Sequence, residues 1–166
     1  MPETPYPSQE LMPPFNVFSI SKNQGQAFYY ESTIAAPTSG SDVIAIKNIS
    51  ETKTMYIDSI EMSSKAIATW SAWLASTTDL ITGTSITGVN LNKGSSNTDS
   101  ASALGDDNIV YAYPDSRVFF GRSQANEWLY RPVGGLWVLP IDKTFVIRFA
   151  QGTSTDLYVG VTAVFD

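Results

Sequence analysis

The carboxylates of this sequence are the side chains that could take part in the most kinds of chemistry. The 166 residues include no histidine and no cysteine, which excludes Ser-His-Asp and Cys-His catalytic sets and thiolate zinc sites. A glycosidase would need two carboxyl groups about 5–10 Å apart. The candidates are Asp106 with Asp107, Asp58 with Glu61, and Asp115. Because 16 acidic residues spread over one domain also form close pairs by chance, we expect solvated turn residues here and no enzyme activity.

A calcium site is the second chemistry that the acidic residues permit. Asp99, Asp106, Asp107 and Asn108 supply hard oxygen ligands within one polar stretch. Their spacing matches no EF-hand loop, and Asp and Asn are also the usual residues of turns. No Gly-rich loop ends in Lys-Ser or Lys-Thr, so the sequence predicts no P-loop. We therefore expect no metal and no cofactor.

Tryptophans provide a third kind of candidate site. Trp70, Trp73, Trp128 and Trp137 could form a platform on which sugar rings stack. A buried core or a subunit interface explains such residues as well, because large aromatic side chains dominate both. A carbohydrate-binding module therefore stays open as an alternative.

The charge of the chain argues against two classes of partner. The net charge is −6, and lysine and arginine are scattered without forming a basic stripe. Binding to a phosphate backbone requires such a stripe, so we expect no nucleic acid and no anionic membrane surface as partner. No apolar run approaches the roughly 20 residues of a membrane helix. The start of the chain, MPETPYPSQELMPP, lacks the basic and apolar regions of a signal peptide.

Strands are the elements that must position any site in this chain. Two segments, 144–150 and 156–165, alternate apolar and polar residues with period 2, as strands with one core face do. We expect them to form a hairpin, and likewise 43–49 with 54–63. We expect a long loop at 95–108. The other predicted strands are 26–34, 66–76, 109–113, 117–120, 127–130 and 136–139, with short additions at Ile86 and 89–91.

Residues 1–24 are expected to form an extended N-terminal arm. Five prolines forbid a continuous helix and remove strand hydrogen-bond donors. The arm packs on the chain's own sandwich or lies across a neighbouring subunit. Its apolar residues are costly to leave in water, so they are the candidate interface residues. These are Tyr6, Leu11, Met12, Phe15 and Phe18.

The predicted fold follows from these elements. Nine or ten short strands with turns every 8–12 residues, and no convincing helix, are typical of a β-sandwich or jelly roll. We predict an all-β chain with one antiparallel sandwich over 25–166 after the proline-rich arm. Charged residues make up only 16% of the chain, against about 25% in an average domain, which suits surfaces that meet other proteins.

Three stretches carry a resemblance to a known group of proteins. They are VIAIKNISETKTMYIDSIEM at 43–62, ITGTSITGVNLNKGSSNTDSASA at 81–103 and GLWVLPIDKTFVIRFAQGTSTDLYVGVTAVF at 135–165. Together they resemble small β-sandwich virion proteins encoded beside the capsid genes of tailed bacteriophages. In that group, K-N-I-S and Y-I-D-S-I mark a strand pair that precedes a polar stretch with N-L-N-K-G-S, and a V-L-P turn then leads into the closing hairpin.

The resemblance implies a structural role without catalytic residues. Capsid decoration (cement) proteins of this group are jelly-roll trimers or dimers on the outer surface of the capsid, where they bind and stabilise the shell of major capsid protein. We therefore expect a virion protein whose partners are the major capsid protein and itself, as a homotrimer or else a dimer. The alternatives are a neck, baseplate or fibre protein and the carbohydrate-binding module.

Overall fold

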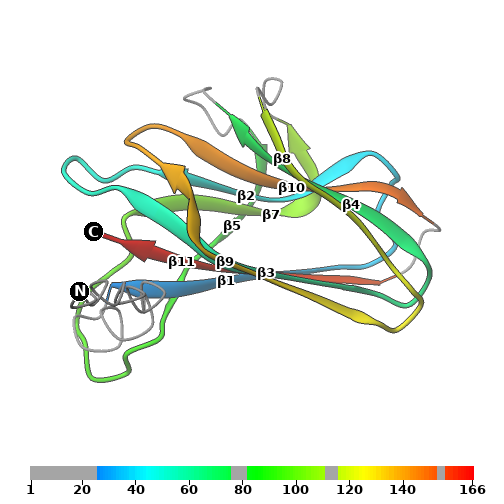
Figure 1. Ribbon diagram of the computed structural model, residues 1–166, viewed down its shortest axis with the longest axis horizontal. Helices are drawn as coiled ribbons and strands as arrows, with labels where there is room; N and C mark the ends of the chain where they lie inside the picture. The colour runs from blue at the N-terminus through cyan, green and yellow to red at the C-terminus, as the bar shows by residue number, and fades with distance from the viewer. Residues whose placement is uncertain (1–25, 76–81, 111–115, 153–155) are drawn as a thin grey trace, which may run out of the picture.

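The computed structural model describes residues 26–75, 82–110, 116–152 and 156–166, and these form two antiparallel β-sheets packed face to face (Figure 1). The predicted all-β fold is confirmed, and every regular element in these ranges is a strand. No helix in these ranges could cross a membrane. The strands are β1 (Ala27–Ile34), β2 (Ser41–Asn48), β3 (Met55–Ser64), β4 (Ala68–Ala75), β5 (Thr82–Ile86), β6 (Val89–Asn90), β7 (Ala101–Val110), β8 (Ser116–Ser123), β9 (Trp128–Leu139), β10 (Thr144–Gly152) and β11 (Leu157–Phe165).

The strand order is that of a jelly roll with an insertion. Sheet A has the order β6-β1-β11-β3-β9, and sheet B has the order β5-β7-β2-β10-β4-β8. Without β5, β6 and β7, the two sheets are β1-β11-β3-β9 and β2-β10-β4-β8, which are the two four-stranded sheets of a jelly roll. In this set, consecutive strands lie in opposite sheets, except β4 and β8, which pair with each other in sheet B. The chain therefore passes from one sheet to the other at each of the remaining connections.

Both predicted hairpins are wrong for that reason. Strand β2 pairs with β7 and β10, whereas β3 pairs with β9 and β11. In the same way β10 pairs with β2 and β4, and β11 with β1 and β3. The predicted core faces are nevertheless correct. Period-2 alternation identifies the buried face of a strand, but it does not identify the strand beside it.

The core lies between the two sheets and is rich in aromatic residues. Trp70, Phe145, Phe149 and Phe165 are buried there. The rings of Trp70 and Phe149 meet edge to face at 5.7 Å, and the Trp70 indole nitrogen donates to Ser123 Oγ at 2.9 Å. The segment around Trp70 is the strand β4, as predicted, although its alanines favour a helix.

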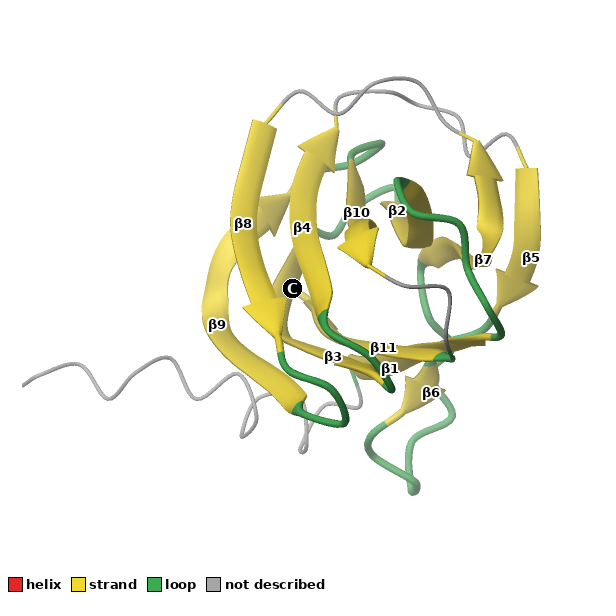
Figure 2. Cartoon of the chain, turned by 90° about the vertical axis from the view of Figure 1, so that its right-hand side faces the viewer, coloured by secondary structure: helices red, strands yellow, loops and turns green. Residues whose placement is uncertain are grey.

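The insertion widens both sheets on one side of the sandwich. Strand β6 pairs with the start of β1, and β5 and β7 extend sheet B beyond β2 (Figure 2). The predicted loop at 95–108 is therefore wrong in part, because 101–110 is the strand β7. The small residues of this segment are typical of a loop, so the sequence did not indicate a strand. One of them, Gly105, lies so close to Ser32 of β1 that a Cβ atom at residue 105 would collide with it. The predicted short strands at Ile86 and 89–91 are confirmed as β5 and β6.

The opposite side of the sandwich ends in the edge strands β8 and β9 (Figure 2). The structure has one bent strand, β9, where the sequence predicts two. Its register against β3 moves from Ser59↔Pro132 to Ile57↔Trp137, so extra residues bulge out between them. Gly134 and Gly135 form this bend with φ values of +61° and +76°. Proline and positive φ are tolerated because β9 is an edge strand with one free side.

Candidate functional site

The outer face of sheet A carries a cluster of aromatic rings and carboxylates, here called the aromatic patch. Its residues come from four neighbouring strands and alternate with the core residues of those strands. On β1, for example, Phe28 and Tyr30 point into the core, so Tyr29 and Glu31 point outward. The residues of the patch are Tyr29, Glu31, Glu61, Trp128, Tyr130 and Tyr158.

The strand register brings these residues together across the sheet. Glu31 lies opposite Gly160, Gly160 opposite Glu61, and Glu61 opposite Tyr130. Gly160 leaves space in the middle of this row, and the Tyr29 hydroxyl lies where a Cβ atom at residue 160 would be. The side chains of the patch therefore lie side by side on one face of sheet A, and the Tyr29 hydroxyl fills the space over Gly160.

Hydrogen bonds order the polar part of the patch. Tyr29 Oη donates to Glu61 Oε2 at 3.3 Å, and Tyr158 Oη donates to Glu31 Oε2 at 3.4 Å. The two hydroxyls also contact each other within hydrogen-bond distance. Each phenol hydroxyl has one proton, so Tyr29 and Tyr158 have two protons for the three contacts just described. The cluster therefore has more acceptors than donors.

Burial raises the pKa of the Tyr29 hydroxyl well above its usual value near 10, and contact with Tyr158 and the charge of Glu61 raise it further. The pKa of Tyr158 is raised as well, chiefly by burial and also by Glu31 and Glu61, although its hydrogen bond with Tyr29 opposes the increase. Both phenols are therefore neutral donors at ordinary pH, facing two carboxylate acceptors.

Two large rings of the patch remain open to solvent. Trp128 is 59% exposed and Tyr130 is 56% exposed, and they stand on the same face of β9. The Trp128 ring meets the Tyr158 ring edge to face with centroids 4.7 Å apart. This contact fixes the orientation of Trp128 while leaving more than half of the side chain accessible.

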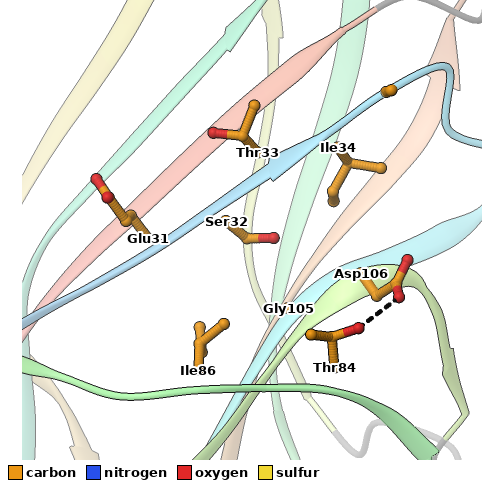
Figure 3. Close-up of a pocket in the computed structure, with 9 residues that line it drawn as sticks. Glu31, Ser32, Thr33, Ile34, Thr84, Ile86, Gly105 and Asp106 are labelled. Carbon is orange, nitrogen blue, oxygen red and sulfur yellow. Dashed lines mark hydrogen bonds between the residues drawn. The ribbon is translucent and has the colours of Figure 1, made fainter.

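A pocket of about 310 Å³ opens beside the patch, between β1 and the inserted strands β5 and β7 (Figure 3). Glu31 belongs to both the pocket lining and the patch. Thr84 Oγ1 donates to Asp106 Oδ2 at 2.8 Å on the side of the pocket formed by β5 and β7 (Figure 3). The lining consists of Glu31, Ser32, Thr33, Ile34, Ala35, Thr84, Ile86, Gly105 and Asp106.

Apolar side chains project from the last part of β9 and the turn after it. Leu136 is 82% exposed, Val138 is exposed on the same face, and Ile141 follows in the turn. We call Leu136, Val138 and Ile141 the apolar ridge. Val138 also lines a shallow apolar hollow of about 260 Å³ together with Leu74 and Leu139. Exposed apolar clusters of this kind usually mark a surface that is covered by a partner.

The carboxylates singled out in the sequence do not gather into one site. Asp106 contacts Thr84, and Glu61 contacts Tyr29. Burial raises the pKa of Asp58. Asp115 lies outside the described residues, and nothing is described of the side chain of Asp107.

The candidate calcium ligands Asp99 and Asp106 likewise have other partners. Asp99 Oδ2 accepts the backbone N–H of Gly88 at 2.9 Å, and Asp106 accepts the Thr84 hydroxyl. The side chain of Asn108, like that of Asp107, is not described. In the described ranges, no three acidic side chains come together in a way that could bind a metal ion.

The four tryptophans do not form one platform. Trp70 is in the core, and Trp137 stacks on the core residue Phe145 with ring centroids 5.7 Å apart. Trp73 lies on sheet B, where the guanidinium of Arg117 lies over its ring at 5.7 Å. Trp128 alone of the four belongs to the aromatic patch.

The tyrosines of the patch were not predicted as site residues. The alternation of β11 indicates that Tyr158 and Gly160 face away from the core, and this is the only signal that the sequence gives for them. Their proximity to Tyr29 and Trp128 depends on the strand order. The arm residues Tyr6, Leu11, Met12, Phe15 and Phe18 lie outside the described residues, so their role stays a prediction.

Comparison of the chain with protein-family models, with curated proteins and with solved structures finds no match. The functional argument therefore depends on the surfaces described above and on the resemblance in the sequence.

Proposed function

We propose that this protein is a structural virion subunit, a capsid decoration (cement) protein that binds and stabilises a shell of major capsid protein. The sequence resemblance motivates this proposal. The jelly roll is compatible with it, since viral capsid domains use this architecture, but a fold alone does not determine function. The surface must therefore supply the supporting observation.

The apolar ridge is the observation that carries the proposal. Leaving apolar side chains in water costs about 25 cal/mol for each Å² of exposed apolar area, and monomeric proteins rarely expose large contiguous apolar patches. The ridge follows the edge strand β9 and ends in the turn at Ile141. A second copy of this chain is the occupant that we propose, because most soluble oligomers are closed and symmetric. A homotrimer is favoured, and a dimer is the alternative.

The arm has a separate role in the proposal. A proline-rich segment loses little conformational entropy when it is fixed in an extended form, so it is suited to lie across a neighbouring subunit. We propose that residues 1–24 contact the major capsid protein through Tyr6, Leu11, Met12, Phe15 and Phe18. Cement subunits then reach the shell through the arm and one another through the ridge.

Binding to capsid shells tests the proposal. Purified protein is mixed with expanded shells of the major capsid protein encoded beside it, and the bound fraction is measured by co-sedimentation. We expect saturable binding in many copies per shell, and much weaker binding after deletion of residues 1–20. Cooperative unfolding of the truncated chain is the control that shows the sandwich intact.

Two outcomes contradict the proposal. The first is the absence of binding to expanded shells by the full chain. The second is labelling of whole virions only at the neck, baseplate or fibres in cryo-electron micrographs, which would assign the protein to one of those parts. Hundreds of copies distributed over the shell surface are the expected pattern for a cement protein.

A further inference from the structure

We propose that the aromatic patch is a binding site for a neutral, hydroxyl-rich glycan. This activity uses a different part of β9 from assembly, because Trp128 and Tyr130 lie before the bend at Gly134 and Gly135 whereas Leu136 and Val138 lie after it. Three properties of the patch carry the proposal: its exposed rings, its excess of hydrogen-bond acceptors and the sign of its charges.

The exposed rings supply the apolar contact. A pyranose ring has a face of C–H bonds that packs against an aromatic ring, and Trp128 and Tyr130 offer two such rings to solvent. They are two residues apart on one strand, which separates them by about 6.6 Å along β9. The Tyr158 ring keeps Trp128 in place at 4.7 Å, so little side-chain freedom remains to be lost on binding.

The hydrogen-bonding groups match hydroxyl donors. Two phenol protons serve three contacts among Tyr29, Tyr158, Glu31 and Glu61, which leaves carboxylate lone pairs without a proton from these phenols. A sugar hydroxyl donates to a carboxylate and can also accept from a phenol. Such charge-assisted hydrogen bonds are about twice as strong as neutral ones.

The charges of the patch exclude anionic ligands. Its two ionisable carboxylates, Glu31 and Glu61, are not matched by any lysine or arginine within the patch, and the pocket lining adds Asp106. Phosphorylated, sulfated and sialylated polymers are therefore disfavoured. A cationic ligand is disfavoured less strongly, and it becomes an outcome of the test.

The adjoining pocket adds hydroxyl-bearing residues beside the patch. Glu31 joins the patch to this hollow of about 310 Å³, whose lining includes the hydroxyl-bearing residues Ser32, Thr33 and Thr84. Hydroxyl groups suit a neutral polyhydroxylated chain, whereas Glu31 and Asp106 in the same lining would attract a cation, which is why a cationic probe is part of the test. A glycan that stacks on β9 can thus extend past Glu31 into the pocket.

Affinity electrophoresis of the full chain tests the proposal. Native gels contain one of three neutral polysaccharides (hydroxyethylcellulose, dextran or yeast mannan), or dextran sulfate as the anionic probe. An oligo-arginine peptide, titrated in solution, is the cationic probe. We expect at least one neutral polysaccharide to retard the protein and to protect Trp128 from acrylamide quenching, and we expect no effect of dextran sulfate.

Variants then locate the site. We expect Trp128→Ala and Tyr130→Ala each to weaken the binding about tenfold, in line with the loss of one ring contact. Phe120→Ala is the matched control, because Phe120 is 58% exposed on β8 of the other sheet and should leave binding unchanged. Glu61→Gln removes the charge and keeps an acceptor, so a smaller loss is expected.

The proposal is overturned if none of the three neutral polysaccharides retards the protein, or if Phe120→Ala weakens the binding as much as Trp128→Ala. Binding of the oligo-arginine peptide or dextran sulfate in place of a neutral polysaccharide also overturns it and assigns the patch to a charged partner. Because shell binding is measured separately, failure here leaves the proposed capsid role intact.

Discussion

At the scale of residues, the outer face of sheet A is organised by one glycine. Gly160 gives the Tyr29 hydroxyl room to reach Tyr158 and Glu61 across β11. A larger residue at this position would push the Tyr29 hydroxyl away from Tyr158 and Glu61. The polar network thus depends on the absence of a side chain at residue 160.

The raised pKa of Tyr29 predicts a loss of stability at alkaline pH. In the unfolded chain a tyrosine loses its proton near pH 10, whereas folded Tyr29 retains it. Below about pH 10 both states are protonated, and above it the free energy of unfolding falls as pH rises. Tyr29→Phe should make this fall shallower, as measured by urea unfolding at a series of pH values. Identical slopes for the two proteins would show that Tyr29 does not titrate in this way.

The hydrogen bond inside the core gives a second prediction. Ser123→Ala leaves the buried indole N–H of Trp70 without its acceptor, which should lower the free energy of unfolding by about 1–3 kcal/mol. Ser71→Ala is the matched control, because it removes the acceptor of the part-buried Trp73 indole, where water can substitute. Equal losses in the two variants would contradict this account of Trp70.

The residue types of the core were predictable, whereas the patch was not. Alternation assigns Phe145, Ile147 and Phe149 to one buried face, and the structure agrees. Tyr29, Trp128 and Tyr158 are far apart in the chain and meet only because β11 lies between β1 and β3. One sequence contains no direct signal of that neighbour relation.

At the scale of elements, the jelly roll explains why local patterns mislead about pairing. Two strands with a short polar link normally form a hairpin, yet β2 and β3 turn into opposite sheets. The buried residues Asn48 and Ser50 support this crossing, since Asn48 Nδ2 donates to the Leu139 carbonyl at 3.0 Å and Ser50 Oγ accepts the Lys53 N–H at 2.9 Å. Such contacts are invisible in the sequence, where 50–53 is an ordinary polar turn.

The bend of β9 yields a prediction about backbone conformation. Gly134 has a φ of +61° and no neighbouring atom near the position of a Cβ, so replacing it with alanine adds backbone strain without a steric clash. We expect Gly134→Ala to lower the free energy of unfolding by about 1–2 kcal/mol in thermal or urea unfolding. Gly94→Ala, in the exposed loop after β6, is the control without positive φ. Equal stabilities of the two variants would contradict the role of the bend.

At the scale of the whole molecule, the three surfaces are arranged around one rigid sandwich. The apolar ridge lies at one end of β9, the aromatic patch spreads over the outer face of sheet A, and the pocket is lined by residues of β1, β5 and β7. Under the two proposals, glycan binding uses the first part of β9 and self-association uses the last part.

The fold class was predictable at this scale because many short alternating strands permit few architectures. The widening of the sandwich was not, because β7 consists largely of small and polar residues that read as a loop. The sequence identified β8 and β9 as strands, but only the sheet order shows that they are edge strands. The position of the apolar ridge on an edge strand could therefore not be predicted.

The mass of the protein in solution tests the central claim of assembly through the ridge most directly. Sedimentation equilibrium should give a closed oligomer for the wild type, a trimer in the favoured case, and a monomer for Ile141→Asp. Ile67→Asp is the matched control, because Ile67 and Ile141 are both 44% exposed and both lie outside the strands. Ile67 follows the end of β3 at Ser64, whereas the ridge lies beside the start of β3 at Met55. Ile67→Asp should retain the wild-type mass. A monomeric wild type, or equal dissociation of both variants, would contradict the claim.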